Sequence, residues 1–395
     1  MRILYCQKMI FPNQSAHALH TGMTAANFAE AGCETHYYPG TPLVGGKAVM
    51  DGFYSRLGFA CQPAPLRLDT IPCRQKGLYG AAFRARLWLA MQSGPALCFA
   101  SSVKEAVMAL ELRAFSRGKH DLRVVFEAHH LISRLKDGRE AERLHALERR
   151  AFTEADMVVF NCRALRDDAG GYLPEPATSA VSPLGYNEKV IRAVRDPARS
   201  EPSEERGGVR LAYVGSIQPG KGVENLVRAL ARLPEDYSLT IVGGWPQSRV
   251  EAIARLAAEC STASRLTFTG VVEQQKVGDF LADCDIYVIP LGTERDFYAP
   301  IKMFEALGFG VPVVATPMAS LRQTLTDGEN ALFATGPDPA SLASALLRLG
   351  NNPLLRKRMR LNNLEAAKQL TAGQRARDLL ALFAKELWRD RETLI

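Results

Sequence analysis

The sequence lacks a long uncharged apolar run. The nearest candidate, residues 87–103, is broken by the polar and helix-breaking residues 92–95, whereas a helix that spans a bilayer needs about 20 consecutive apolar residues. Residues 1–11 have too short an apolar core for a signal peptide and are typical of a first β-strand. The sequence therefore predicts neither a membrane-spanning helix nor a secretory leader.

Cysteine pairs are also absent. The eight cysteines are scattered, none of them belongs to a Cys-x-x-Cys pair, and several lie inside apolar strand patterns. Neither a zinc site nor a disulfide framework is indicated, so a reducing cytoplasm is the expected location. The sequence also has no internal repeat at solenoid spacing. The cysteines are Cys6, Cys33, Cys61, Cys73, Cys98, Cys162, Cys260 and Cys284.

What the sequence does contain is the composition of a soluble globular protein, with 47% hydrophobic and 23% charged residues. Its 395 residues are enough for two α/β domains of ordinary size. Basic residues outnumber acidic ones by 49 to 42, which gives a net charge of +7. This excess is modest, so its placement along the chain matters more than its size.

Basic residues gather between Arg67 and Arg86, where Asp69 is the only acid and aromatic and leucine side chains recur at helical spacing. One interpretation is a basic amphipathic surface resting on an anionic membrane, which would place the protein peripherally at the inner membrane face. The other, which we favour, is a helix that faces the core and has a solvated basic side. No recognised nucleic-acid motif accompanies the patch, so no nucleic-acid partner is expected. The basic residues are Arg67, Arg74, Lys76, Arg84 and Arg86.

Strand and helix patterns alternate along the chain, which is typical of parallel sheets covered by helices on both faces. A polar stretch rich in Pro and Gly, residues 195–208, separates two such series and indicates a linker. We expect an α/β fold with a first domain at 1–190, a linker at 191–208, a second domain at 209–370 and a C-terminal helix at 371–395. Strands are expected at 2–6, 96–100, 122–126, 157–161, 210–214, 238–242, 265–269, 286–289, 311–315 and 331–333, and helices at 18–31, 103–116, 139–153 and 374–388.

The segment 299–316 combines a turn, a short helix and a Val-rich strand. Pro300 suits the start of a helix, and Gly308 and Gly310 suit its end. The N–H groups at such a helix start can bind an anion, and Glu305, one turn further on, can hold a pair of ribose hydroxyls. The alternative is an ordinary βαβ crossover with Glu305 on its solvent side.

A second glycine-rich turn opens the second series. A strand is expected to end at Gly215, followed by Ser216, Lys221 and Gly222 and then by a helix that begins near Val223. Ligands of open α/β sheets bind at the carboxyl ends of the strands, where this turn is expected. Lys221 and the exposed backbone of the glycines would suit a phosphate. The turn lacks the spacing of a P-loop, and alone it would be equally typical of a solvated helix start.

With these motifs in place, the chain resembles the retaining nucleotide-sugar glycosyltransferases of family 4, over nearly its whole length. In the second half the resemblance follows Tyr213-Val-Gly-Ser, Leu239-Thr-Ile-Val-Gly-Gly, Asp283-Cys-Asp and the 300–316 block, in family order. In the first half, Val125-Phe-Glu127-Ala-His129 resembles the family's strand that ends in Glu-x-His. The resemblance implies the GT-B architecture, in which two doubly wound Rossmann-like domains face a central cleft and the C-terminal helix crosses back to the first domain.

The resemblance also implies roles for individual residues. Three carry the catalytic roles: His129 faces the donor sugar, Lys221 contacts the donor diphosphate, and Glu305 holds the donor ribose. No metal and no cofactor are implied, because cations and helix ends stabilise the leaving diphosphate of a UDP or GDP type donor; no Asp-x-Asp metal site is expected. The implied donor-binding residues are Gly215, Ser216, Lys221, Gly222, Val272 near the base, Asp296, Pro300 and Ile301 near the diphosphate, and Glu305.

Two positions depart from the family pattern. The Glu-x7-Glu motif requires a glutamate at 297, where this chain has Phe297; the nearby acids Glu294 and Asp296 could each replace it, and we favour Asp296. The arginine usual after the strand glycine is Ser216. Both departures put recognition of the donor sugar in question more than nucleotide binding.

The leading hypothesis is a metal-independent retaining glycosyltransferase in polysaccharide biosynthesis. It would move a hexose-type sugar to a hydroxyl of a glycan or lipid-linked acceptor. The alternative is a non-catalytic, nucleotide-sugar-binding or scaffold member of a polysaccharide assembly system, motivated by Phe297 and Ser216. A third hypothesis is another GT-B enzyme, an epimerase or a phosphorylase, although no cofactor-lysine site for a phosphorylase is found.

Overall fold

The computed structural model describes residues 2–10, 16–41, 57–59, 63, 65–69, 71–72, 78–194, 207–292 and 300–388. It has two compact units: the first is Met1–Gly185 with Ala372–Ile395, and the second is Tyr186–Thr371. The N-terminal segment of the first unit therefore ends at Gly185, five residues before the expected end of the first domain at 190. The helix α7 (Glu188–Val194) occupies the beginning of the expected linker, and residues 195–206 lie outside the described residues.

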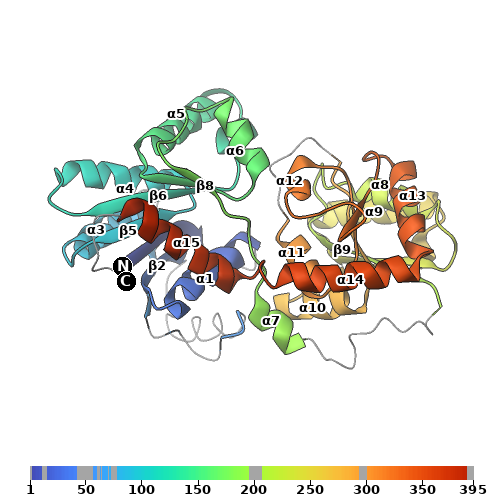
Figure 1. Ribbon diagram of the computed structural model, residues 1–395. Helices are drawn as coiled ribbons and strands as arrows, with labels where there is room; N and C mark the ends of the chain where they lie inside the picture. The colour runs from blue at the N-terminus through green and yellow to red at the C-terminus, as the bar shows by residue number, and fades with distance from the viewer. Residues whose placement is uncertain are drawn as a thin grey trace. The chain divides into compact units, whose positions relative to one another are not determined.

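The first unit is built on one parallel sheet, with the strand order β3-β2-β1-β5-β6-β7-β8 and with β4 paired to β2 (Figure 1). The order reverses between β1 and β5, as in doubly wound folds. Its strands are β1 (Arg2–Ile10), β2 (Glu34–Thr41), β3 (Leu66–Leu68), β4 (Ile71–Pro72), β5 (Ala96–Ala100), β6 (Leu122–Ala128), β7 (Met157–Phe160) and β8 (Ser179–Val181). The helices are α1 (Ala16–Glu30), α3 (Leu78–Met91), α4 (Val103–Phe115), the 3₁₀ turn η1 (Ile132–Leu135), α5 (Gly138–Glu154), α6 (Arg163–Gly170) and α15 (Ala372–Leu387).

The last helix, α15, completes the core of the first unit. In Figure 1 it lies beside α1, although the two helices come from opposite ends of the chain. Phe383 is fully buried, with ring centroids 6.4 Å from Phe28 of α1 and 5.7 Å from Phe99 of β5. Leu379 and Leu387 extend the same contact. The amphipathic pattern at the end of the sequence is thus explained by burial against α1 and the sheet.

The basic helix of the first unit, α3, faces the core. Tyr79, Phe83 and Leu87 are buried, while Arg84 pairs with Glu111 and Arg86 with Asp69. This arrangement matches the core-facing interpretation of the 67–86 stretch; Arg74 and Lys76 lie outside the described residues. Among the helices that the structure describes, none combines the length and apolar character needed to cross a bilayer.

The second unit holds six parallel strands in the order β11-β10-β9-β12-β13-β14. Numbered within the unit, this is the doubly wound order 3-2-1-4-5-6. The strands are β9 (Val209–Gly215), β10 (Tyr237–Gly243), β11 (Leu266–Gly270), β12 (Ile286–Ile289), β13 (Val313–Ala315) and β14 (Ala331–Phe333). The helices are α7, α8 (Val223–Leu230), α9 (Gln247–Glu259), the 3₁₀ turn η3 (Ala263–Arg265), α10 (Gln274–Asp283), α11 (Ile301–Gly308), α12 (Ala319–Arg322), α13 (Pro339–Gly350) and α14 (Pro353–Ala367).

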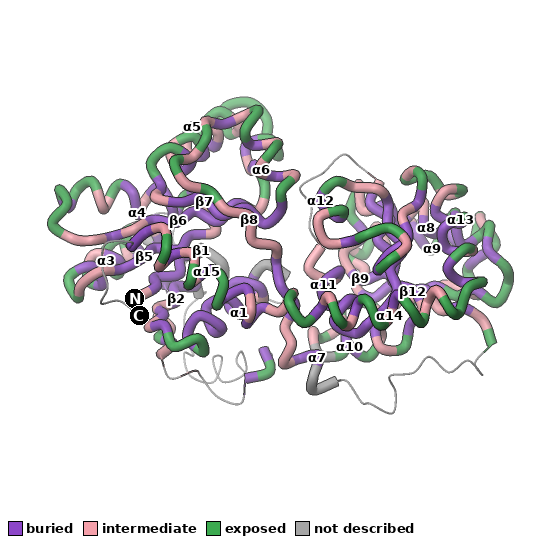
Figure 2. The backbone as a smooth tube through the Cα atoms, in the orientation of Figure 1, coloured by how far each residue is buried: buried purple, intermediate pink, exposed green. Residues whose placement is uncertain are grey.

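Burial explains why these segments form a sheet. In Figure 2 the strands are largely buried, whereas α5 and α14 present exposed faces. Strands β12 and β13 are buried at every residue, which is typical of parallel strands covered on both sides. The ends of the surrounding helices follow local rules: Asp338 accepts hydrogen bonds from the backbone N–H groups of Ala340 and Ser341 at the start of α13. The predicted fold class, two doubly wound α/β domains, is confirmed.

Candidate functional site

The second unit has its topological switch point between β9 and β12. Helices leave the sheet in opposite directions at such a point, so a crevice forms at the carboxyl ends of the two strands. β9 ends at Gly215, and β12 ends at Ile289 just before Pro290. The glycine-rich turn predicted to bind phosphate follows β9 directly, so the structure places it at this switch point.

The turn packs closely against the segment after β12. Gly222 caps α8 with φ = +73°, and a Cβ at this position would lie 1.5 Å from the carbonyl oxygen of Pro290. The N–H of Gly292 donates to the carbonyl oxygen of Gly220 at 3.0 Å. Only glycine fits where backbone approaches backbone this closely with a positive φ. Lys221 is thereby held at the crevice, half-buried, between two glycines.

Gly215 and Ser216 lie at the same edge. Gly215 has φ = +150°, and a Cβ on its neighbour Gly243 would lie 2.5 Å from the carbonyl oxygen of Gly215. The hydroxyl of Tyr213 donates to the carbonyl oxygen of Ser216 at 2.7 Å. Gly215, Ser216, Lys221 and Gly222 therefore form one ordered turn at the carboxyl edge of the sheet.

Glu305 is buried, not on a solvent-facing side of its helix. It retains 7% of its exposure, and its Oε1 accepts hydrogen bonds from Nε2 of Gln274 at 2.7 Å and from Nζ of Lys302 at 2.8 Å. Lys302 also donates to Oε2 of Glu305 at 2.8 Å and to Oε1 of Gln274 at 2.7 Å. The solvent-facing position that the alternative gave to Glu305 is therefore wrong, although α11 does connect the parallel strands β12 and β13.

The Glu305 cluster joins two helix starts. α11 begins after Pro300, and α10 begins at Gln274, two residues after Val272. Pro300, Ile301 and Val272 are half-buried. Sequence analysis missed Gln274 and Lys302: Lys302 could have been found from its i,i+3 spacing to Glu305, whereas Gln274 comes from another helix. Asp296 and Phe297 lie outside the described residues, so the first half of the Glu-x7-Glu pattern remains a prediction.

One Asp-x-Asp spacing does occur, at Asp283 and Asp285. Both carboxylates pair with Arg210, at 2.6 Å and 3.2 Å, and Asp285 also accepts from the backbone N–H of Arg210 at 2.8 Å. They precede β12, whereas the glycine-rich turn follows β9, so they lie at the opposite edge of the sheet. These aspartates tie β12 to β9 and are distinct from the crevice.

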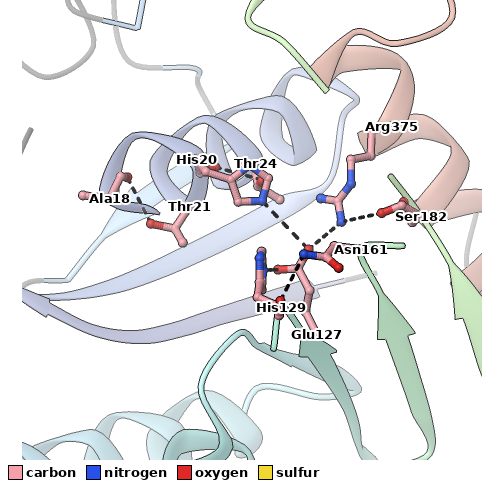
Figure 3. A network of polar contacts seen from close by, with 9 residues as sticks. All are labelled: Ala18, His20, Thr21, Thr24, Glu127, His129, Asn161, Ser182 and Arg375. Carbon is pink, nitrogen blue, oxygen red and sulfur yellow. Dashed lines mark hydrogen bonds and ion pairs between the residues drawn. The ribbon is translucent and has the colours of Figure 1, made fainter. Parts of the chain in front are cut away.

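The first unit holds a buried polar cluster at the end of β6. Figure 3 shows His20, His129 and Arg375 converging on the carboxylate of Glu127, which has no exposed surface. Nε2 of His129 lies 3.0 Å from Oε2 of Glu127, and a guanidinium N–H of Arg375 donates to Oε1. Nε2 of His20 lies 3.9 Å from Oε1, an electrostatic contact and not a hydrogen bond. Nδ2 of Asn161 donates to the carbonyl oxygen of His129 at 3.3 Å.

The charges in this cluster are set by burial and by one another. Burial acts to raise the pKa of Glu127, but the electrostatic effects of His129 and Arg375 and the contacts of both histidines outweigh it and hold the pKa well below its ordinary value. Burial lowers the pKa of His20 to about 4, against the opposing effect of Glu127. Glu127 is therefore an anion and His20 a neutral imidazole at neutral pH.

His20, Glu127 and His129 also meet the spacing of metal ligands, since one ligand atom from each lies within 4.8 Å of the others. Two imidazoles and a carboxylate would suit zinc or iron. The guanidinium of Arg375 already holds the carboxylate, and its fixed positive charge opposes a second cation at the same place. The geometry therefore favours an ion-pair cluster over a metal centre.

Sequence analysis singled out His129 and Glu127 but missed three partners: His20, Asn161 and Arg375. Arg375 lies 248 residues from Glu127 along the chain, so no local pattern could connect them. His20 is a polar residue on the buried face of α1. Its polar character among buried positions is the only feature of the sequence that could have indicated a site there.

The architecture matches solved GT-B structures over nearly the whole chain. Anabaena HepE in complex with UDP aligns with a TM-score of 0.75 and 15% identity, covering 98% of this chain and 100% of that one. Sucrose-phosphate synthase from Thermosynechococcus elongatus aligns with a TM-score of 0.73 and 16% identity, covering 98% and 99%. WaaG, a glycosyltransferase involved in lipopolysaccharide biosynthesis, aligns with a TM-score of 0.67 and 17% identity, covering 96% and 99%. These similarities establish the fold class: two Rossmann-like domains of the GT-B type.

The sequence comparisons identify the second unit more narrowly. Residues 208–352, all within the second unit, match the family model described as Glycosyl transferases group 1. Relatives named D-inositol 3-phosphate glycosyltransferase include those of Nocardia farcinica, 32% identical over 252 residues, and of Corynebacterium efficiens, 28% identical over 263 residues. The alignments cover 61% of this chain and 55% of the first relative, and 63% and 61% for the second. The chain thus spans little more than half the length of these curated relatives.

Proposed function

We propose that this protein is a retaining glycosyltransferase that transfers a hexose-type sugar from a nucleotide-diphosphate donor to an acceptor hydroxyl, without a metal. The observation that carries the proposal is the buried carboxylate of Glu305 in the second turn of α11, in the same unit whose sheet carries the Lys221 turn at its switch point. The Glu305 carboxylate could accept hydrogen bonds from ribose hydroxyls. The Lys221 ammonium and the backbone N–H groups of its turn could bind a diphosphate. The match of residues 208–352 to glycosyl transferases group 1 supports the same conclusion.

Glu305 retains capacity to bind a ribose although Gln274 and Lys302 contact it. Two of the contacts described for its carboxylate fall on Oε1 and one on Oε2. An ionised carboxylate has about four acceptor positions, so Oε2 can accept a further hydroxyl. Lys302 supplies the counter-charge that a buried carboxylate needs.

The remaining residues take the roles that the family resemblance implies. Lys221 and the backbone at Pro300 and Ile301 stabilise the departing diphosphate, where negative charge grows in the transition state. The backbone at Val272 meets the base, and His129 positions or polarises the donor sugar. Asp296 is proposed to take the place of the glutamate missing at 297.

A UDP-type donor is the first to test, and GDP-type donors the second. HepE is known in complexes with UDP and with UDP-glucose, and it shares the fold.

For the acceptor, we propose a glycan or a lipid-linked sugar, and the name of the sequence relatives makes inositol phosphate a compound to include. A lipid-linked acceptor would place the protein at the cytoplasmic face of a membrane, held by the basic side of α3. Failure to sediment with anionic vesicles at low salt would remove this membrane contact.

The test is a thermal-shift series with UDP, GDP and their sugar conjugates. A nucleotide at a hundredfold its Kd adds about 2.7 kcal/mol of stability. We expect one nucleotide to raise Tm clearly, Glu305→Gln to abolish that shift, and the exposed Glu251→Gln to leave it unchanged. Lys221→Ala should lower kcat by about 10²- to 10³-fold, because it removes a donor to the charge that develops on the leaving group.

The outcomes separate the enzyme from a second candidate, a non-catalytic nucleotide-sugar-binding member of an assembly. Phe297 and Ser216 favour that candidate, since both replace residues of the family pattern. Binding of a donor with no turnover on any acceptor would select it. Absence of a shift with every nucleotide would contradict both.

A further inference from the structure

Arg375 is a buried arginine whose contribution to stability does not explain why a charged residue occupies this position. It belongs to α15 and keeps only 6% of its exposure. One nitrogen, Nη2, donates to Oε1 of Glu127 and lies 3.4 Å from the carbonyl oxygen of Ser182. Its Nε and Nη1 are buried without a hydrogen-bond partner in the described residues. Burying donors in this way is unfavourable, and an apolar pair in place of Arg375 and Glu127 would fill the space without that cost.

The Glu127 carboxylate divides its two oxygens between Arg375 and His129. Oε1 accepts from Arg375 and faces His20 at 3.9 Å, while Oε2 lies 3.0 Å from Nε2 of His129. A carboxylate is planar, so fixing one oxygen fixes the direction of the other. This contact lacks the angles of a hydrogen bond, but a negatively charged oxygen 3.0 Å from Nε2 still favours the tautomer with the proton on Nε2.

Nothing else in the described residues could hold Glu127 in this orientation. His20 is a neutral imidazole, because burial lowers its pKa, and it stands too far from Oε1 for a hydrogen bond. Without Arg375, the carboxylate would keep His129 as its only close polar partner. It could then turn toward either histidine.

We infer that Arg375 is a positioning residue for His129 and acts through Glu127. It clamps Oε1, so that Oε2 holds the His129 ring in one orientation and in the Nε2–H tautomer. This inference rests on the proposed function, in which His129 meets the donor sugar. The helix α15 would then affect the reaction through Glu127 and His129, without contacting the substrate itself.

The test is a double-mutant cycle between Arg375 and His129. Arg375→Lys keeps the positive charge but loses the fixed direction of the guanidinium. We expect it to lower kcat about 10- to 100-fold with little change in the donor KM, because a small misplacement of a reacting group has effects of this size. In a His129→Ala background, the same change should have no effect on kcat. Arg377→Lys, on the exposed side of the same helix, is the matched control and should leave kcat unchanged.

Two outcomes would overturn the inference. If Arg375→Lys lowers kcat equally with and without His129, its role is structural; if it lowers kcat in neither, Arg375 positions nothing. Should Arg375→Lys unfold the protein, the pair Glu127→Gln with Arg375→Met removes both buried charges together. In that folded variant kcat should stay low, and a kcat equal to the parent value would again contradict the inference.

A second measurement does not depend on turnover. Imidazole ¹⁵N spectra distinguish the two tautomers, and His129→Ala identifies the His129 signal among the seven histidines. We expect the Nε2–H form of His129 in the parent protein and a mixture of forms in Arg375→Lys. Identical spectra would overturn the inference even if the proposed glycosyl transfer is correct. If the spectra change but His129→Ala is still active, the inference that Arg375 orients His129 holds. In that case the proposed role of His129 in glycosyl transfer is wrong.

Discussion

At the scale of single residues, each candidate site contains a buried carboxylate held by one partner that is near in sequence and one that is distant. Glu127 is paired with His129 and Arg375, and Glu305 with Gln274 and Lys302. Burying an unpaired charge is energetically unfavourable, so each carboxylate needs hydrogen-bonding or charged partners. The sequence pattern predicted the carboxylates because each belongs to a recognisable element, Glu127 to the end of a strand and Glu305 to a short helix. It could not predict Arg375 or Gln274, since only the folded chain brings them close.

The buried His20 predicts acid sensitivity of the first unit. Its pKa is about 4 in the folded protein and about 6.5 in the unfolded chain, so the unfolded state binds more protons between these values. The stability that depends on a neutral His20 is fully present above pH 6.5 and is lost as the pH falls to 4, by up to about 3 kcal/mol. We expect Tm to fall steeply over this window, and His20→Gln to reduce the slope of Tm against pH.

The comparison is made by calorimetry from pH 7.5 to 4, with pH 7.5 as the internal reference because His20 is neutral there in both states. The Glu127 carboxylate adds a loss of stability at lower pH: its folded pKa lies below the unfolded value, so its contribution disappears as pH falls through the folded pKa. Equal slopes for His20→Gln and the parent between pH 6.5 and 4 would show that His20 does not titrate on unfolding.

At the scale of elements, the contact between the glycine-rich turn and the end of β12 sets the geometry of the candidate donor site. Gly222→Ala should destabilise the second unit strongly, because the new Cβ would meet the carbonyl oxygen of Pro290 at 1.5 Å. Gly270→Ala is the matched control: it has a similar φ, +69°, with no atom within 4 Å of the added Cβ. Positive φ alone costs about 1 to 2 kcal/mol, and we expect Gly222→Ala to cost a further 1 to 3 kcal/mol or more. Urea unfolding measures both, and similar losses would refute the close contact.

The elements that sequence analysis placed best are strands buried on both faces. The expected strands 96–100 and 286–289 agree with β5 and β12 to the residue, because a parallel strand covered on both sides is a short apolar run between turns. β2 was missed, since it contains Glu34, Pro39 and Gly40, which are unfavourable in strands. β13 begins at Val313 and not at 311, because the N–H of Val311 closes the end of α11 by donating to the carbonyl oxygen of Ala306.

At the scale of the whole molecule, the two-domain α/β architecture follows from the rhythm of strands and helices. The boundaries were harder to predict, because they depend on which unit a helix packs against. α7 lies just after the chain enters the second unit and contacts α10 and α11 there, so it belongs to that unit and not to a linker. The site residues of the second unit lie at the predicted edge, whereas their roles toward a donor stay predictions until binding is measured.

The docking of α15 predicts that its core residues stabilise the first unit selectively. Phe383→Ala removes a fully buried ring that packs against Phe28 and Phe99, a change that typically costs about 3 to 5 kcal/mol. Calorimetry should show unfolding of the first unit at lower temperature, with the nucleotide-dependent shift of the second unit retained. The exposed Leu354→Ala should change neither. Loss of the nucleotide shift in Phe383→Ala would indicate that the second unit depends on α15 for its fold.

The first unit takes its sheet from the beginning of the chain and its last core helix from residues 372–387. The ribosome makes these two parts at different times, with the whole of Tyr186–Thr371 between them. Domains generally fold as units as they emerge, so the second unit can reach its final structure while the first still exposes the apolar surface that Leu379 and Phe383 later cover. We therefore expect the second unit to finish folding before the first, and a chaperone that shields this surface would act during synthesis of the second unit.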